Sequence, residues 1–375
     1  MKRSSFCCIF LGLFLWFLPG GGQAQQDIDS IFPVRALAIA APSPALVDSF
    51  VMFIHKELGP RKINRLVLRV DYRYQYKSHP ELTDPDALGT REVKKIVEAC
   101  RKNKIEIIPQ INLLGHQSWA TKVSKLLEVY PQFDETPHVK MPAEYKWPNE
   151  DGLYCKSYCP LHPEVHKVVF DLVDEVCDAF EASAFHAGMD EVFYIGDDKC
   201  PRCKGLDKSV LFAQEVNRVR DHLSLKGRQL WIWGDRLIDG RATGIGMWEG
   251  SFNDTHRAVD MIAKDVVICD WHYERPDKTA VYFAMKGLSV ISCGWRNPQN
   301  AMEQVKDMKR FREGSTPVMK ARFLGVMETV WSGVAPFFHE YYYPSTVEPS
   351  KEQTYSVAKT FKEMFNEVSR QAEIK

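Results

Sequence analysis

Eight short apolar segments begin near residues 34, 64, 105, 184, 229, 266, 288 and 324. Helical patterns separate most of them, as in residues 90–104 and 162–180, where apolar side chains recur at helical spacing. Such an alternation is typical of parallel β-α-β units. Eight of these units predict an α/β fold of the (β/α)8, or TIM, barrel class.

An open, doubly wound sheet is the alternative arrangement for this pattern. That fold usually carries a glycine-rich phosphate-binding turn after its first strand. Here residues 41–44 follow the first apolar segment and read Ala-Pro-Ser-Pro. The sequence therefore favours the closed barrel.

Residues 1–24 have the features of a secretory signal peptide. The start is basic, residues 6–18 are apolar, and Gly22 and Ala24 suit cleavage after Ala24. The apolar run is short for a membrane-spanning helix, although an uncleaved anchor is the alternative. We expect residues 25–375 to form one barrel domain of a secreted or periplasmic protein, because about 350 residues suit a single barrel. No membrane span would remain after cleavage.

The charge pattern excludes two classes of partner. Lysine and arginine together number 49, as do aspartate and glutamate, so the formal net charge is zero. The basic residues also form no single dense cluster. Nucleic acids and anionic membranes are therefore not expected as main partners.

The most informative segment is residues 185–192, Phe-His-Ala-Gly-Met-Asp-Glu-Val. It predicts a short buried strand with Asp190 and Glu191 at its end. Side chains alternate along a strand, so both carboxylates reach one pocket only if the strand has already ended. Two carboxyls in one buried site repel, so one is expected to titrate high and act as an acid. A helix start or a solvated turn is the alternative interpretation.

Polar and aromatic residues also follow the other predicted strands. In a barrel the carboxyl ends of all strands meet on one face, where active sites lie. We therefore expect a substrate site formed by Asp71, His116, Trp233, Asp235, Trp271, Tyr273, Trp295 and Trp331. The long irregular stretch of residues 117–160 is rich in aromatic residues and is expected to form a wall of this cleft. It could also be an ordinary surface insertion.

Four cysteines flank the central segment in sequence: Cys155, Cys159, Cys200 and Cys203. Two disulfides between loops would suit a secreted protein. The spacing also suits a structural zinc site with four thiolate ligands. Sequence alone leaves both readings open, with free thiols as the third.

The pattern His186-x-Gly188-x-Asp190-Glu191 after an apolar strand resembles the signature of family 20 glycoside hydrolases, the β-N-acetylhexosaminidases. The resemblance extends over about residues 34–335. The barrel begins close to the expected mature N-terminus without an accessory β domain, so the chain looks most like the hexosaminidase D branch.

The resemblance implies a retaining exo-β-N-acetylhexosaminidase that acts on glycans with a terminal N-acetylhexosamine, either gluco or galacto. It implies substrate assistance, in which the sugar's acetamido oxygen attacks the anomeric carbon. Glu191 would be the acid and base, and Asp190 would hold the acetamido N–H. Trp233, Trp271 and Trp331 would enclose the acetamido methyl group, and Tyr273 would contact its oxygen. The chemistry implies no cofactor and no catalytic metal.

Two departures from the family pattern are visible. The arginine expected at the end of the first strand is replaced by Ala-Ile-Ala-Ala-Pro, with Arg73, Arg236 and Arg296 as candidate substitutes. The Trp-x-Glu pattern after the eighth strand becomes Trp331-Ser332-Gly333. These departures motivate an alternative function, a catalytically inactive glycan-binding protein on the same barrel. A metal-assisted barrel hydrolase with His116, Asp190, Glu191 and Asp235 as ligands is a third hypothesis.

Overall fold

The structure, a computed structural model, describes residues 28–145, 155–344 and 356–373. The expected signal peptide, residues 1–24, lies outside these ranges, so its cleavage stays a prediction. No helix in the described ranges is long and apolar enough to cross a membrane.

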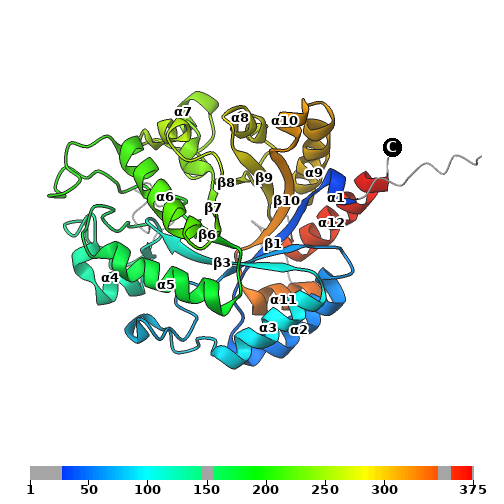
Figure 1. The fold of residues 1–375 in the computed structure, drawn as a ribbon, viewed down its shortest axis with the longest axis horizontal. Coiled ribbons are helices and arrows are strands. Elements are labelled where there is room, and N and C mark those ends of the chain that lie inside the picture. The colour runs from blue at the N-terminus through cyan, green and yellow to red at the C-terminus, as the bar shows by residue number, and fades with distance from the viewer. Residues whose placement is uncertain (1–27, 146–154, 345–355, 374–375) are drawn as a thin grey trace, which may run out of the picture.

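Eight parallel strands close into a barrel in the order β1-β10-β9-β8-β7-β6-β3-β2 (Figure 1). This confirms the predicted fold class. The strands are β1 (Val34–Ala40), β2 (Arg65–Arg69), β3 (Glu106–Leu113), β6 (Ala184–Gly188), β7 (Gln229–Trp233), β8 (Val267–Trp271), β9 (Ser289–Gly294) and β10 (Phe323–Val330). The register shifts between Gln110 and Leu113, where β3 pairs with β6.

Helices surround the barrel in Figure 1. The longer ones are α2 (Val47–Phe53, continued by a π-helical turn), α3 (Thr90–Lys102), α5 (Val165–Ala179), α6 (Lys208–Ser224), α8 (Thr279–Met285), α9 (Pro298–Glu313), α11 (Val334–Tyr342) and α12 (Val357–Glu373). Their starts follow from local chemistry. Asn297, for example, accepts hydrogen bonds from the backbone N–H groups of Gln299 and Asn300, and Pro298 occupies the first helical position.

Two apolar layers hold the barrel. An inner layer fills its interior and includes Ala36, Val67, Ile108, Trp231 and Met327. A larger outer layer lies between the strands and the helices. An aromatic cluster within it joins α2 to α11 and α12, where the Phe53 ring centroid lies 5.1 Å from Phe338 and 5.8 Å from Phe361. The last helices are thereby packed against the first, which supports closure between β1 and β10.

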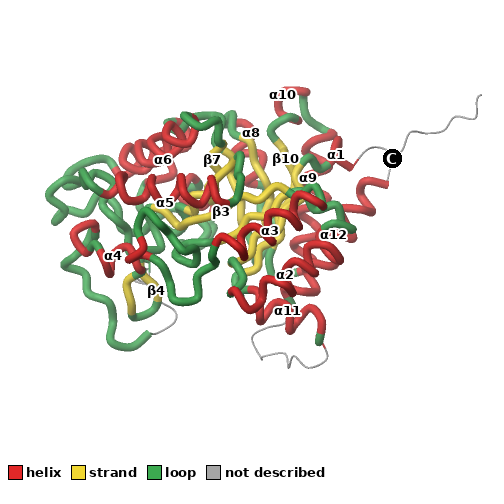
Figure 2. Tube along the Cα trace, turned by 60° about the horizontal axis from the view of Figure 1, so that its bottom comes forward, coloured by secondary structure: helices red, strands yellow, loops and turns green. Residues whose placement is uncertain are grey.

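The connection between β3 and α5 is mostly irregular, as residues 117–160 predicted. Its described part contains the two-stranded sheet of β4 (Ser118–Trp119) and β5 (Lys122–Val123) and the short helix α4 (Lys125–Val129). In Figure 2 this part lies on the side of the molecule opposite α12. A bridge between Asp134 and Tyr158 joins the middle of the connection to its later part.

One carboxyl group is buried at a cost to stability. Glu328 on β10 is 0% exposed, and neither of its carboxylate oxygens has a hydrogen-bond partner in the described parts of the chain. Burial raises the pKa of Glu328 well above its usual value, and the charge of Glu340 adds to this shift. The group therefore stays protonated in the fold at pH values where the unfolded chain releases the proton.

We predict that Glu328→Gln stabilises the protein relative to wild type increasingly as pH rises. Because the folded state binds more protons than the unfolded state above the ordinary carboxyl pKa, wild-type stability falls by about 1.4 kcal/mol per pH unit there. The glutamine side chain does not titrate, so the variant lacks this dependence of stability on pH. Urea unfolding at several pH values, with the exposed Glu98→Gln as control, measures the difference. A constant difference across pH would contradict the buried protonated carboxyl.

Candidate active site

The residues expected at the strand ends do meet on one face of the barrel. Asp190 and Glu191 follow β6, and His116 follows β3. His116 Nε2 lies 3.1 Å from Asp190 Oδ2 and 3.5 Å from Glu191 Oε2. One imidazole thus contacts both carboxylates, so the two acids occupy one pocket although they are adjacent in sequence.

An unusual backbone lets both acids face this pocket. Gly188, Met189 and Glu191 have φ angles of 66°, 65° and 49°, in the left-handed region. The strand therefore ends before the acids, which removes the alternation that would have separated them. At Gly188 a Cβ atom would also lie 2.4 Å from Asn112 Oδ1, so only glycine fits there.

The two acids differ in surroundings. Asp190 is 6% exposed, and its Oδ1 is buried with no hydrogen-bond partner among the described residues. Burial alone would raise the pKa of Asp190, but the charge of His116 and its hydrogen bond outweigh this and hold the pKa below its usual value. For His116, burial would lower the pKa, whereas Asp190 raises it well above the usual value. The two groups form an ion pair through Oδ2 of Asp190, and Oδ1 can still accept a hydrogen bond.

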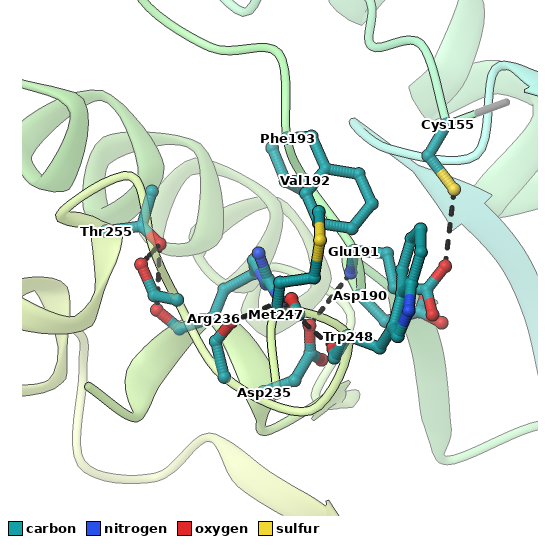
Figure 3. A network of polar contacts seen from close by, with 12 residues as sticks. Cys155, Asp190, Glu191, Val192, Phe193, Asp235, Arg236, Met247, Trp248 and Thr255 are labelled. Atoms are coloured by element: carbon teal, nitrogen blue, oxygen red, sulfur yellow. Dashed lines mark hydrogen bonds and ion pairs between the residues drawn. The ribbon is translucent and has the colours of Figure 1, made fainter. Parts of the chain in front are cut away.

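Glu191 is held from two sides. Its backbone N–H donates to Asp235 Oδ2 at 2.9 Å, and the thiol of Cys155 donates to its Oε2 at 3.3 Å. Figure 3 shows the Cys155 sulfur directed at the Glu191 carboxylate. The sulfur also lies 3.5 Å from His116 Nδ1. Cys155 therefore contacts the acid pair of Asp190 and Glu191 through Glu191, and contacts His116 as well.

This position corrects the expected cysteine quartet. Cys155 contacts His116 and Glu191, whereas Cys159, Cys200 and Cys203 lie together elsewhere with Glu135. Residues 155–159 run without helical structure, and four extended residues span up to about 14 Å. The thiols of Cys155 and Cys159 are thus carried to different sites.

Asp235 lies behind the acids. It is 1% exposed, and its Oδ2 accepts a second hydrogen bond from Arg236 Nε at 2.6 Å. Its Oδ1 accepts from Trp271 Nε1 at 3.2 Å. Arg236 in turn donates to the carbonyl groups of three residues in one loop, Met247, Trp248 and Gly250. The arrangement places Asp235 as a support for Glu191, and it buries Arg236 too deeply for a sugar contact.

The aromatic residues form a continuous layer beside the acids. Ring centroids of Trp233 and Trp331 lie 5.5 Å apart, and those of Trp271 and Tyr273 lie 5.1 Å apart. Trp331 Nε1 donates to the Tyr273 hydroxyl at 3.0 Å, which links the two pairs. Burial raises the pKa of Tyr273 well above its usual value, so the hydroxyl stays protonated. Trp295 extends the layer, 5.2 Å from Tyr273.

Asp71 and Arg69 lie at the end of β2. Asp71 Oδ1 accepts from the Asn112 N–H at 2.8 Å, and burial raises the pKa of Asp71. Sequence reasoning missed Arg69, whose guanidinium lies 4.6 Å from the centroid of the Trp331 ring and donates to the Val330 carbonyl at 3.1 Å. Arg69 pairs in register with Ala40, the end of the first strand. It brings a positive charge next to the position where the family arginine was expected.

Comparisons with known proteins identify the family of this chain. The family model "Glycosyl hydrolase family 20, catalytic domain" matches residues 61–344. A beta-hexosaminidase of Porphyromonas gingivalis is 26% identical over 205 residues, which cover 48% of this chain and 24% of that protein. Hexosaminidase D of Bos taurus is 24% identical over 207 residues, covering 53% of this chain and 54% of that protein. The matches thus span about a quarter to about half of these relatives' length.

Two solved structures share the fold. The chitobiase of Flavobacterium johnsoniae is 20% identical with a TM-score of 0.58, covering 91% of this chain and 52% of that chain. A beta-N-acetylhexosaminidase of Bacteroides fragilis is 18% identical with a TM-score of 0.57, covering 89% of this chain and 66% of that chain. The family model matches most of the chain, including the acid pair and most of the strand ends described above. The protein therefore belongs to glycosyl hydrolase family 20.

Proposed function

We propose that the protein is a retaining exo-β-N-acetylhexosaminidase that hydrolyses terminal β-linked N-acetylglucosamine or N-acetylgalactosamine by substrate assistance. The observation that carries the proposal is the buried, unpartnered Oδ1 of Asp190 beside Glu191. With the predicted signal peptide, the enzyme would act outside the cytoplasm.

The ionised Asp190 would accept the hydrogen bond of the acetamido N–H through Oδ1. His116 keeps the carboxylate charged, so Asp190 can stabilise the positive charge that develops on the acetamido group during attack. The protonated hydroxyl of Tyr273 would donate to the acetamido oxygen and turn it toward the anomeric carbon. Trp233, Trp271 and Trp331 would pack around the methyl group, which their apolar faces suit.

Glu191 would protonate the leaving oxygen and then take a proton from the attacking water. Its carboxylate is partly accessible, with 14% of the side chain exposed, so both substrate and water can reach it. The backbone bond to Asp235 fixes the Cα position of Glu191, and the Cys155 thiol restrains the carboxylate. The intact acid pair does not favour the alternative of an inactive glycan-binding protein.

We predict that Glu191→Gln lowers kcat/KM by roughly 10²–10⁴-fold on an N-acetyl-β-glucosaminide with an alkyl leaving group. The loss should be smaller with 4-nitrophenolate, which needs less protonation to leave. Initial rates on both substrates and on the galacto epimers measure this difference, and a thiazoline that mimics the oxazoline intermediate should inhibit the wild type. Equal losses on both leaving groups would contradict the acid role. Sugar binding without turnover would favour the inactive alternative.

We predict that Asp235→Asn lowers kcat by roughly 10–100-fold because Glu191 shifts, and that it changes KM less, because only Trp271 among the proposed sugar contacts loses a hydrogen bond. Steady-state kinetics measure the split between kcat and KM. Asp239→Asn is the control, since Asp239 lies four residues further on and caps the helix α7 (Gly240–Thr243). A Tm loss without a kcat effect would assign Asp235 to stability alone.

A further inference from the structure

Four buried groups meet at a second place, on the two long connections that flank β6. Cys159 and Glu135 come from the connection before α5, and Cys200 and Cys203 come from the turn before α6. All four residues are 0–2% exposed. Their ligand atoms lie within 4.8 Å of one another. None of these residues takes part in the acid pair or the aromatic layer.

The distances between the sulfur atoms are close to those between two ligands of a tetrahedral zinc ion. Cys159 Sγ lies 3.6 Å from Cys200 Sγ and 3.5 Å from Cys203 Sγ. Zinc binds thiolates at about 2.3 Å, so two sulfurs on one tetrahedral zinc ion lie about 3.8 Å apart. A disulfide requires about 2.05 Å and would use only two of the three thiols. The Cys159 sulfur lies at almost the same distance from the other two sulfurs, which suits three thiolates on one ion better than a disulfide between two of them.

Glu135 offers a fourth possible ligand atom. Its Oε1 accepts from the Asp197 N–H at 3.0 Å, which orients the carboxylate. Its Oε2 is buried and lacks a hydrogen-bond partner within the described ranges. A buried carboxylate oxygen without a partner is costly, and a cation would provide the missing interaction.

The surroundings resemble the outer shell of a metal site. Arg202, between the two cysteines of the turn, points Nε at Cys159 Sγ at 3.4 Å. Three thiolates and one carboxylate carry more negative charge than one divalent ion neutralises, and Arg202 offsets part of the excess. The backbone is also fixed, since the Cys159 N–H donates to the Phe133 carbonyl at 2.7 Å and the Cys200 N–H to the Asp197 carbonyl at 3.0 Å.

We propose that Glu135, Cys159, Cys200 and Cys203 form a structural zinc site. Thiolate-rich tetrahedral sites select zinc among the common divalent ions, and four protein ligands leave no open position for substrate. The ion would join the loop that follows Glu191 to the connection between β3 and α5. This site differs from the four-cysteine arrangement that sequence spacing indicated, because Glu135 replaces Cys155.

The test is the zinc content of the purified full-length chain, measured by elemental mass spectrometry after growth with added zinc. We expect about one zinc per chain in the wild type and below about a tenth of that in Cys159→Ser and Cys200→Ser. Glu135→Gln should keep the thiolates and weaken zinc affinity at least tenfold, measured by competition with a chromogenic chelator. Cobalt substitution should give a thiolate charge-transfer band and tetrahedral d–d absorption.

Two matched controls locate the ion. Cys155→Ser removes the thiol that contacts Glu191, and it tests whether this fourth cysteine of the predicted quartet binds the ion. Cys100→Ser removes a buried thiol of α3. Both variants should keep their zinc. Loss of zinc in Cys155→Ser would overturn the proposed ligand set. Wild-type protein without zinc would overturn the site itself, as would an intact mass lower by two hydrogens with two thiols blocked to alkylation, which would identify a disulfide.

Discussion

The arrangement of the site depends on the hydrogen bonds of the Asp235 carboxylate, because they join the ends of three neighbouring strands. It accepts from the backbone of Glu191 after β6, from Arg236 after β7 and from Trp271 on β8. Burial raises the pKa of Asp235, although the charge of Arg236 opposes the shift. A buried ion pair contributes little net stability, but removal of one partner is costly. Such a contact is therefore better explained by the position that it imposes on Glu191 than by the stability of the barrel.

The strand ends around the site also hold backbone strain. Five residues outside glycine adopt left-handed φ angles there: Asp71, Leu114, His116, Met189 and Glu191. Each such residue costs about 1–3 kcal/mol, so the rest of the fold must stabilise these conformations. The closed barrel provides that support, since its inner and outer apolar layers are both continuous. The strain directs side chains from adjacent positions toward one pocket, which a regular strand end could not do.

Much of the barrel was predictable because strands buried on both sides give continuous apolar runs. The apolar segments predicted to begin near residues 34 and 229 coincide with the starts of β1 and β7, and the polar residues predicted at the strand ends lie together on one face. Arg69 was missed although the alternation of side chains along β2 could have identified it. Arg69 lies two residues after Val67, whose side chain points into the barrel, and so it shares the same face of the strand. Glu135 and Cys155 could not be assigned, because irregular connections give no periodicity that relates sequence spacing to distance. The roles of individual sugar contacts stay predictions.

The proposed zinc site would also act on the connection between β3 and α5. This connection contains little regular structure, and polar contacts help to hold it in addition to the buried side chains of Phe133 and Tyr158. Lys156, only 2% exposed, donates to the carbonyl groups of Thr136 and Val139 and pairs with Asp134. Cys155 and Cys159 leave this same short stretch toward the acid pair and the proposed zinc ligands. An ion bound at Cys159 would thus fix the segment that carries Cys155 to Glu191, and would couple this connection to the Glu191 carboxylate without a contact between zinc and substrate.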